Sequence, residues 1–309
     1  MSKKLRIIFM GTPEFAVESL EILLKNNYDV AAVVTAPDRP AGRGRKLSMS
    51  AVKTKALEHQ IPVLQPKRLK DEDFIEELRS YQANLFIVVA FRMLPEVIWD
   101  MPEIGTFNLH ASLLPQYRGA APINWAIING ETQTGITTFF IEHKIDTGDI
   151  LMSETVDILP SDNASSLHDR LMQKGAELVL KTVTNIERGT IESQPQPKGV
   201  KLKPAPKIFK EDCLLDFQED VISVHNKIRG LSYYPGAFTQ LQGKVLKIFK
   251  TEVEQTDDAV EIGVFNTDEK TYMKVKCSNG WLNILELQLE GKKRMSTEDF
   301  LRGYNFTNE

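Results

Sequence analysis

The sequence predicts an α/β chain in two parts, a mainly parallel sheet with helices on both faces followed by a small β-barrel. Patterns typical of buried strands alternate with helical patterns through residues 1–189, which favours parallel βαβ units. Residues 207–309 instead show several short strand patterns and a helix, which suits a small barrel. The length of 309 residues agrees with two domains or one large one.

Apolar periodicity and capping residues place the elements of the first part. The expected strands are 5–10, 30–35, 85–90, 105–110, 135–142 and 149–156, with a short extended piece at 62–66. The expected helices begin at Pro13, Ser50, Asp71 and Pro122, and a long one runs from Asp162 or Asn163 to Arg188. Strand, helix and strand at the start of the chain imply a right-handed βαβ unit and a parallel sheet. Because Gly11-Thr12-Pro13 is not a Gly-x-Gly-x-x-Gly motif, we expect no dinucleotide site there.

A proline-rich stretch separates the two parts. Residues 190–206 hold four prolines among glutamines and lysines, which is typical of a semi-rigid linker. We therefore predict a first domain at 1–189, a linker at 190–206 and a second domain at 207–309. The second domain should contain a helix at 219–231 and strands near 237–242, 244–253, 260–265, 271–277 and 281–287.

Charge and composition limit the function classes. The net charge of −4 argues against a general nucleic-acid binder, yet residues 39–46 and 198–210 are locally basic and contain no acid. Residues 36–47 also hold prolines and glycines, so we expect a mobile loop. Cys213 and Cys277 lack metal or redox spacing, which suits packing residues in a reducing cytoplasm. There is no run of 18 apolar residues and no signal-peptide pattern, so no membrane segment is expected.

The strand at 105–110 carries the first candidate site residues. Alternation puts Asn108 and His110 on one face of this strand, with Phe107 and Leu109 on the other. Asp146 lies in the loop after the strand-like run that ends at residue 142, so it can converge with them if the two strands are neighbours. An isolated Asn-x-His at a strand end is more often structural, and an isolated Asp-x-Gly is usually a turn. Both alternatives stay open on these residues alone.

The continuation of this strand carries a family resemblance. Residues 112–123 read Ser-Leu-Leu-Pro-Gln-Tyr-Arg-Gly-Ala-Ala-Pro-Ile, which is too apolar for an ordinary surface loop. Together with Ile145-Asp-Thr-Gly-Asp-Ile150 and Pro37-Asp-Arg-Pro-Ala-Gly-Arg-Gly-Arg-Lys-Leu47, this stretch resembles the 10-formyltetrahydrofolate-dependent formyltransferases. The resemblance covers nearly the whole chain. It implies a Rossmann-like catalytic domain, an OB-like second domain that contacts tRNA, and 10-formyltetrahydrofolate as the formyl donor, with no metal.

The resemblance also implies roles for individual residues. Formyl transfer passes through a tetrahedral intermediate with a negative oxygen, and Asn108 can donate a hydrogen bond to that oxygen without titrating. His110 can donate to the same oxygen or move the proton, and Asp146 can orient the histidine or accept a proton. No covalent intermediate is needed, and the sequence has no Gly-x-Ser-x-Gly elbow to form one. The folate-contacting loop corresponds to Ser112, Leu113, Leu114 and Pro115, although core packing of both leucines is the alternative.

The amine acceptor that the resemblance implies is methionyl-initiator tRNA, held at its acceptor stem. Arg43, Arg45 and Lys46 lie in the loop that reaches this stem in the family, and Lys201 and Lys203 of the linker suit phosphates. A solvated surface role is the alternative for any one of these cations. Near residue 92 the sequence departs from the family pattern, so Arg92 alters the expected wall of the pterin site. We expect a cytoplasmic monomer.

Two other functions compete with this interpretation. A folate formyltransferase that acts on the amine of a nucleotide-sugar or of glycinamide ribonucleotide would share the catalytic residues. The glycinamide ribonucleotide enzymes usually stop near the end of the first domain and lack the arginine-rich loop. A non-catalytic RNA-binding protein on an α/β scaffold is the alternative from a different class, and the presence of Asn108, His110 and Asp146 argues against it.

Overall fold

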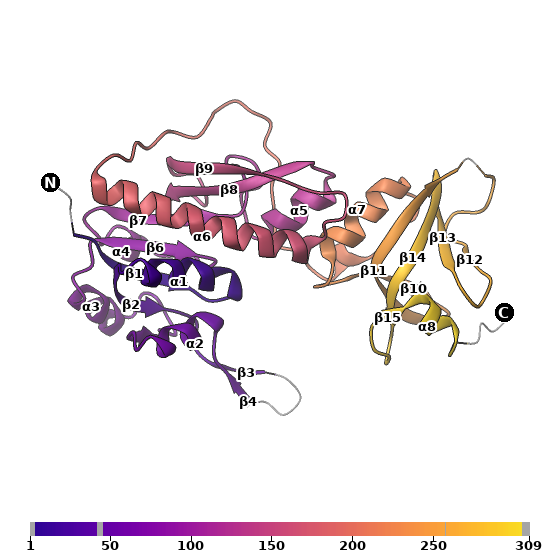
Figure 1. Cartoon of the computed structure of the whole chain (residues 1–309), viewed down its shortest axis with the longest axis horizontal. Helices are drawn as coiled ribbons and strands as arrows, with labels where there is room; N and C mark the ends of the chain where they lie inside the picture. Colours follow the sequence, from indigo (N-terminus) through magenta and orange to yellow (C-terminus); the bar gives the residue numbers. More distant parts are fainter. Residues whose placement is uncertain (1–3, 42–45, 257, 305–309) are drawn as a thin grey trace. The chain divides into compact units, whose positions relative to one another are not determined.

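The computed structural model describes residues 4–256 and 258–304 except 42–45, with the backbone alone at Ala41 and Lys46. Its contacts divide the chain into two compact units, which are drawn in Figure 1. The first comprises Met1–Gly119, Thr134–Val156 and His168–Pro204, and the second Ala120–Gln133, Asp157–Leu167 and Ala205–Glu309. Both units are discontinuous in sequence, and the boundaries predicted at 189 and 206 stay a prediction.

A seven-stranded sheet forms the centre of the first unit, in the order β5-β2-β1-β6-β7-β8-β9. Its strands are β1 (Arg6–Gly11), β2 (Asp29–Val34), β5 (Val63–Leu64), β6 (Leu85–Val89), β7 (Gly105–His110), β8 (Gln133–Phe140) and β9 (Ile150–Asp157). Strands β5, β2, β1, β6 and β7 pair in parallel, and β8 runs antiparallel to β7. These pairings confirm the predicted mainly parallel sheet. The apolar runs of β1, β2 and β6 are buried along nearly their whole length, which is typical of parallel strands covered on both faces.

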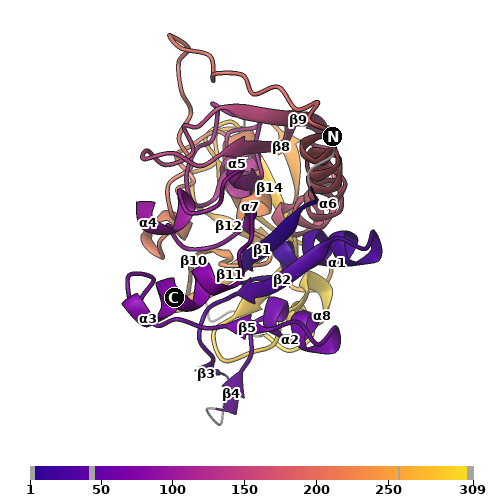
Figure 2. The same cartoon turned by 90° about the vertical axis from the view of Figure 1, so that its left-hand side faces the viewer.

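Helices cover both faces of this sheet (Figure 2). They are the 3-10 turn η1 (Glu14–Ala16), α1 (Val17–Lys25), α2 (Ala51–Glu58), α3 (Glu72–Ser80), α4 (Glu96–Trp99) and α6 (Ala164–Arg188), whose residues 164–167 belong to the second unit. Helices α3 and α4 lie on one side of the strands and α1 and α6 on the other. Phe74 and Leu78 of α3 pack with Val88 of β6 on the first face. On the opposite face, Gly175 of α6 leaves room for Leu109 of β7, because a Cβ there would lie 2.7 Å from Leu109 Cδ2.

The segment at 36–47 is not the uninterrupted loop that its composition predicts. Strand β3 (Arg39–Ala41) pairs antiparallel with β4 (Lys46–Ser48), and Pro40 lies opposite Leu47 in this pair. One-turn helix α4 was also not predicted. It follows Pro95 and buries Ile98 against the sheet, and so short a helix depends on this tertiary contact rather than on its own propensity.

The second unit contains a six-stranded antiparallel sheet that curls into a half-barrel. Its elements are α5 (Pro122–Ile128), η2 (Glu211–Cys213), α7 (Val221–Leu231), β10 (Ala237–Leu241), β11 (Lys244–Gln255), β12 (Phe265–Thr267), β13 (Met273–Cys277), β14 (Gly280–Leu289), β15 (Met295–Ser296) and α8 (Thr297–Leu301). The strand order is β10-β11-β14-β13-β12, with β15 beside β14. The predicted small barrel-like part is confirmed. The strand predicted at 260–265 was wrong, because Gly263 has a φ of 87° and the strand begins only at Phe265.

Two residues of this unit show how closely its elements pack. Gly230 of α7 lies against α5, where a Cβ would be 2.6 Å from the Ile128 side chain, and its carbonyl accepts a hydrogen bond from Asn124 Nδ2 at 2.8 Å. Alternation along β13 puts Lys276 opposite the core residues Met273, Val275 and Cys277, yet Lys276 is only 2% exposed. Its Nζ forms an ion pair with Asp258 Oδ1 at 2.5 Å, which offsets the cost of burying the charge.

Both cysteines are free and buried, as predicted. Burial disfavours the thiolate and raises the pKa of the Cys277 thiol to about 12. In the described part of the chain, no helix is long and apolar enough to span a bilayer. The described residues also hold no group of three or more His, Cys, Asp or Glu arranged to bind a metal ion.

Candidate active site

The end of β7 delivers two of the predicted site residues. Asn108 pairs in register with Val88 of β6 and with Phe139 of β8, and His110 pairs with Thr137 of β8. The alternation of the strand therefore places both polar side chains on one face, as predicted. His110 is buried and Asn108 is half-buried.

Thr137 fixes the loop that follows β7. Its hydroxyl donates to the carbonyl oxygen of Ser112 at 2.7 Å and accepts the backbone N–H of Leu114 at 3.3 Å. Ser112 Oγ in turn donates to the carbonyl oxygen of Gln116 at 2.6 Å. The carbonyl and the hydroxyl of Ser112 are thus both hydrogen-bonded within the protein. Leu113 is half-buried, and it packs against Gly135, where a Cβ would lie 2.4 Å from Leu113 Cδ2.

The hydrogen bonds of His110 fix its proton. Nε2 lies 2.8 Å from the carbonyl oxygen of Tyr117, which can only accept, so Nε2 carries the hydrogen. In the neutral imidazole, Nδ1 is therefore the basic nitrogen. It faces Oδ2 of Asp146 at 3.8 Å, which is ion-pair range but longer than a hydrogen bond.

Asp146 is held through both its side chain and its backbone. Oδ2 accepts the backbone N–H of Gly119 at 2.9 Å, and the residue has a φ of 53°, in the left-handed region that Asp tolerates better than most residues. Gln196 Nε2 donates to the carbonyl oxygens of Asp146 at 2.9 Å and Gly148 at 2.8 Å. Arg118 donates to Gln196 Oε1 at 2.6 Å and completes the support. The structure thus brings His110 and Asp146 together, as predicted.

Asn108 has no hydrogen-bond partner for its side-chain amide among the described residues. An amide held on a strand without an internal partner is available to a ligand. A neutral donor of this kind suits an oxygen on which negative charge develops.

Sequence reasoning missed four residues of this site: Thr137, Arg118, Gly119 and Gln196. Arg118 and Gly119 lie inside the motif at 112–123, yet neither had a role assigned. Gln196 lies in the predicted linker and is only 7% exposed. The pattern Pro195-Gln196-Pro197 gives no signal of burial, because a glutamine in a proline-rich stretch is normally solvated.

The backbone of the predicted linker lies against the same loop. Gln116 donates from Nε2 to the carbonyl oxygen of Lys201 at 3.1 Å and accepts the N–H of Lys203 at Oε1, at 2.8 Å. The carbonyl oxygen of Lys203 accepts the N–H of Tyr117 at 2.7 Å. Lys201 and Lys203 themselves are exposed. Their backbone is therefore fixed beside the candidate site, and both residues are exposed to solvent.

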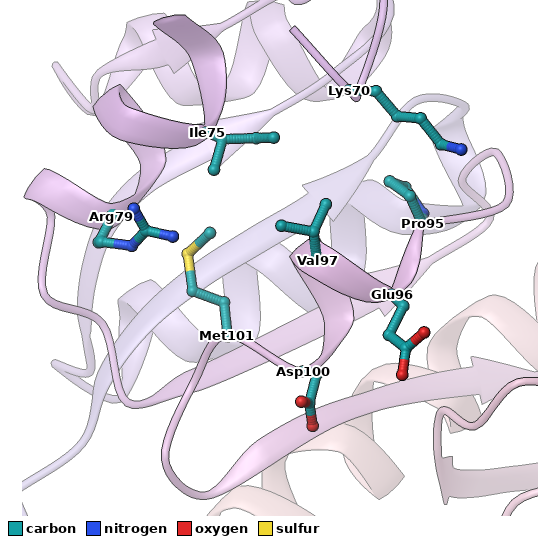
Figure 3. A pocket seen from close by; sticks show the side chains of 8 residues that line it. All are labelled: Lys70, Ile75, Arg79, Pro95, Glu96, Val97, Asp100 and Met101. Atoms are coloured by element: carbon teal, nitrogen blue, oxygen red, sulfur yellow. The ribbon is translucent and has the colours of Figure 1, made fainter. Parts of the chain in front are cut away.

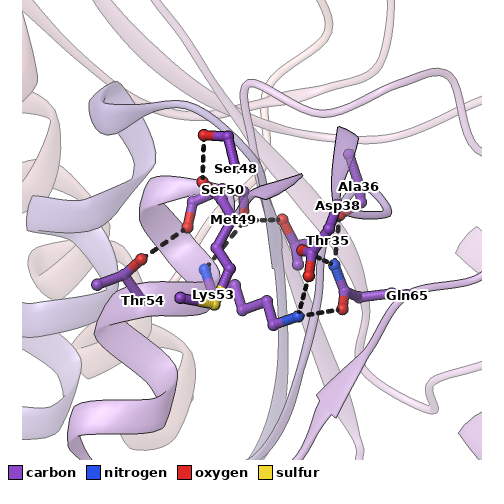
Figure 4. Close-up of polar contacts among 9 residues, drawn as sticks. All are labelled: Thr35, Ala36, Asp38, Ser48, Met49, Ser50, Lys53, Thr54 and Gln65. Atoms are coloured by element: carbon purple, nitrogen blue, oxygen red, sulfur yellow. Dashed lines mark hydrogen bonds and ion pairs between the residues drawn. The ribbon is translucent and has the colours of Figure 1, made fainter. Parts of the chain in front are cut away.

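The base of the β3–β4 hairpin is fixed by a polar network (Figure 4). Lys53 of α2 donates to Asp38 Oδ2 at 2.6 Å and to Gln65 Oε1 at 2.7 Å. Gln65 Nε2 donates to Asp38 Oδ1 at 2.9 Å and to the carbonyl oxygen of Ala36 at 2.8 Å. Arg43 and Arg45, two of the cations predicted to bind tRNA, lie outside the described residues, and Lys46 is described by its backbone alone.

Arg92 stabilises the segment after β6. Its guanidinium donates to the carbonyl oxygens of Pro66 at 2.5 Å and Lys67 at 3.1 Å, and it lies 5.6 Å from the centre of the Phe91 ring. Burial lowers the pKa of Arg92. These contacts give the residue a structural role at the strand end.

A hollow of about 750 Å³ lies elsewhere in the first unit, between α3 and α4 (Figure 3). Ile75, Val97 and Met101 line it, with the bases Lys70 and Arg79 and the acids Glu96 and Asp100 around them. None of the predicted site residues lines it. Its charges are balanced and indicate no ligand class.

Comparison with known proteins identifies related chains. Residues 3–183 match the family described as formyl transferase, and residues 207–305 match the formyl transferase C-terminal domain. A curated methionyl-tRNA formyltransferase from Bacteroides fragilis is 52% identical, with 98% of this chain and 96% of that protein covered. The protein of the same name from Phocaeicola vulgatus is 54% identical, with the same shares covered.

Solved structures share the fold at lower identity. The sugar 3N-formyl transferase WlaRD has a TM-score of 0.66 at 22% identity, covering 94% of this chain and 100% of that one. HypX from Aquifex aeolicus, in complex with tetrahydrofolic acid, has a TM-score of 0.64 at 20% identity, covering 97% of this chain and 47% of that one.

Proposed function

This chain belongs to the formyl transferase family, and we propose that it formylates the amino group of methionyl-tRNA. One observation carries the choice of acceptor. Relatives named methionyl-tRNA formyltransferase match 98% of the chain at 52–54% identity, and the match includes the second unit. The product, N-formylmethionyl-tRNA, serves translation initiation.

The proposed chemistry uses the residues at the end of β7. The amine nitrogen attacks the formyl carbon, the carbonyl π electrons move to its oxygen, and the C–N bond to the carrier then breaks. Asn108, whose amide has no partner among the described residues, donates a hydrogen bond to the oxygen as it becomes negative. Asn108 acts when the charge develops, so its contribution belongs to the transition state rather than to substrate binding.

His110 and Asp146 handle the proton that the amine must lose. Nδ1 of His110 is the basic nitrogen of the neutral ring, and it faces the Asp146 carboxylate at 3.8 Å. The proton passes from the attacking amine to this pair and then to the nitrogen of the leaving carrier, so the enzyme ends as it began. Gln196 and Gly119 hold Asp146 in place, as positioning residues.

A tetrahydrofolate-derived carrier supplies the formyl group, and we propose 10-formyltetrahydrofolate. Ser112, Leu113, Leu114 and Pro115 are proposed to contact it, with Leu113 as the side chain most accessible to an apolar ring. The shape of this loop is set by Thr137 and by internal hydrogen bonds, so the carrier meets a pre-formed surface.

We propose that Arg43, Arg45 and Lys46 contact the acceptor stem of the initiator tRNA, and that Lys201 and Lys203 contact phosphates. The fixed backbone of the two lysines beside the loop at 116–117 supports this, since tRNA must bring its methionyl end to the same site. Because methionyl-tRNA is used in the cytoplasm, we place the reaction there, carried out by a monomer.

The test is incubation of the purified chain with initiator tRNA carrying methionine and with 10-formyltetrahydrofolate labelled in its formyl carbon. Label should appear on the methionyl amine, and the Asn108→Ala variant should transfer it far more slowly. An amino-sugar nucleotide serves as the competing acceptor. Transfer to the sugar amine with none to methionyl-tRNA would overturn the proposal in favour of a sugar formyltransferase.

A further inference from the structure

Two consecutive tyrosines protrude from the second unit just after α7. Tyr234 is 88% exposed, the largest fraction among the exposed large apolar side chains of the described residues, and Tyr233 is 40% exposed. The ring of Tyr234 has no aromatic or cation–π partner in the described part of the chain. The chemistry described above gives these tyrosines no role.

The backbone that carries the two tyrosines is firmly held. Ser232 Oγ donates to the carbonyl oxygen of Phe249 at 3.0 Å, and the N–H of Tyr233 donates to Ser165 Oγ at 3.2 Å. Lys247 Nζ donates to the carbonyl oxygen of Pro235 at 2.8 Å. The exposure of Tyr234 is therefore a property of an anchored turn, and its ring loses little backbone freedom when it binds something.

A guanidinium lies over the Tyr233 ring, and two further cations adjoin it in the sequence. The Arg294 guanidinium carbon lies 3.9 Å from the centre of the Tyr233 ring and 5.6 Å from that of Phe249. Lys292 and Lys293 precede it in the sequence, are exposed, and form no ion pair among the described residues. Of the nearby acids, Glu286 pairs with Arg294 at 3.1 Å and Glu290 accepts the N–H of Val245, so the two lysines remain as unpaired positive charge.

This combination favours one class of occupant. Exposed aromatic faces next to a guanidinium and free ammonium groups are what proteins use to stack unpaired nucleotide bases and hold their phosphates. A protein-binding site would instead place its aromatic anchors at the centre of a larger apolar patch. This surface is locally positive although the chain has a net charge of −4, and a local positive charge suits a polyanionic ligand.

We propose that Tyr233, Tyr234 and Lys292–Arg294, which we term the tyrosine platform, stack an unpaired base of the tRNA substrate and hold the adjacent phosphate. That the nucleic acid is tRNA rests on the proposed function. Tyr234 supplies the open ring face, and Arg294 keeps the Tyr233 ring in place beside it.

The experiment measures binding of fluorescently labelled methionyl-initiator tRNA by anisotropy, over a range of salt concentrations, with the full chain and its variants. Tyr234→Ala should raise Kd about tenfold while leaving the salt dependence unchanged, because stacking neutralises no phosphate. Tyr234→Phe, which keeps the ring, should bind within about twofold of the parent. Lys293→Ala should lower the slope of log Kd against log salt by about one.

Tyr272→Ala is the matched control, because Tyr272 is 41% exposed in the same unit but donates its hydroxyl to Asn266, and no cation lies over its ring among the described residues. It should bind tRNA normally. Unchanged binding by Tyr234→Ala, or equal losses in Tyr234→Ala and Tyr272→Ala, would overturn the platform. Loss of self-association in sedimentation, without any change in tRNA binding, would also overturn it and assign the surface to contacts between copies.

Wild-type activity separates this inference from the proposed function. If the chain formylates methionyl-tRNA and Tyr234→Ala binds tRNA normally, the platform alone is refuted. If the chain transfers formyl only to a sugar amine, the proposed function fails, and undiminished tRNA binding by Tyr234→Ala would then remove the platform as well.

Discussion

Asp146 accepts the backbone N–H of Gly119 at its Oδ2 atom, at a distance of 2.9 Å. The same oxygen faces Nδ1 of His110. A residue of the loop after β8 is thus tied to the loop after β7, and the histidine between them has its other ring nitrogen bound to Tyr117. A shift of either loop would change the His110–Asp146 distance, so the proposed proton-handling pair depends on both loops.

Replacing Asn108 with Ala should lower kcat by roughly 10²–10³, or about 3–4 kcal/mol, with little change in KM for either substrate. The reason is that the amide acts on charge that exists only in the transition state. Since the side chain has no hydrogen-bond partner in the described part of the chain, the melting temperature should stay close to that of the parent. Steady-state kinetics with a thermal melt test this, and a normal kcat would remove Asn108 from the mechanism.

His110 and Asp146 should behave as one unit. Each single alanine variant is expected to lose most of its activity, and the double variant should lose little more, because either change disables the same proton path. The measurement is kcat/KM for the two single variants and the double variant, each shown by calorimetry to be folded. Losses that multiply would instead assign the two residues separate roles.

Gln196→Leu should destabilise the chain by about 1–3 kcal/mol, because a buried carbonyl oxygen and a partly buried one lose their donor. It should also lower kcat, measured well below the melting temperature, because Asp146 loses its support. Gln194→Leu is the matched control: its backbone pairs with Ile150 but its side chain is exposed. Equal effects of the two substitutions, or an unchanged kcat in Gln196→Leu, would show that Gln196 does not position the site.

The sequence predicts the sheet well because burial leaves a strong pattern. β1, β2 and β6 are continuous apolar runs. The alternation in β7 places Asn108 and His110 on one face, and this assignment requires no information about the neighbouring strands. Strand β13 of the half-barrel was predictable for the same reason, because Met273 and Val275 alternate along it and both belong to the core. These features depend on local periodicity, which a single sequence contains.

The support of the site depends instead on contacts between distant segments. Gln196 reaches Asp146 across 50 positions in the sequence, and Lys53 reaches Asp38 across 15. No periodicity encodes either contact. The β3–β4 hairpin was missed for a related reason. Pro40 and the glycines that follow it in the sequence normally indicate irregular structure. The base of the hairpin is instead fixed by Lys53 and Gln65, which lie outside the hairpin and bind Asp38.

Lys53→Met should weaken the hairpin base and change the acid stability of the chain. The Lys53 ammonium and Gln65 lower the pKa of Asp38 below its ordinary value near 4. A carboxyl whose pKa is lowered in the folded state contributes stability that is present above the unfolded pKa and lost as the pH falls through the folded pKa. Below about pH 4, the parent should therefore lose stability more steeply than Lys53→Met.

At neutral pH, Lys53→Met should also raise KM for tRNA while leaving KM for the folate donor unchanged, since the hairpin carries the proposed tRNA contacts. Lys55→Met is the control. Lys55 lies on the same helix, but its ion pairs are with Glu58 and Glu21. Unfolding curves from about pH 2.5 to 7 and kinetics at about pH 7.5 test both points. A rise in KM for tRNA in both variants alike would show a general effect of α2.

The two basic segments should contribute to tRNA binding in different ways. Lys201→Ala or Lys203→Ala should weaken binding of any tRNA and lower the salt slope by about one unit for each phosphate that the variant no longer neutralises. Alanine keeps the backbone hydrogen bonds of both residues to Gln116 and Tyr117, so the loop at 116–117 should stay anchored in both variants.

Arg43→Ala should instead weaken binding of initiator tRNA far more than binding of elongator methionyl-tRNA, if this arginine senses the pairing at the end of the acceptor stem. Folate binding should be unchanged in this variant and in both lysine variants, because the loop at 112–115 is a separate surface. Anisotropy with both tRNAs between about 50 and 200 mM salt measures the difference. Equal losses of initiator and elongator binding in Arg43→Ala would reduce that arginine to a nonspecific cation.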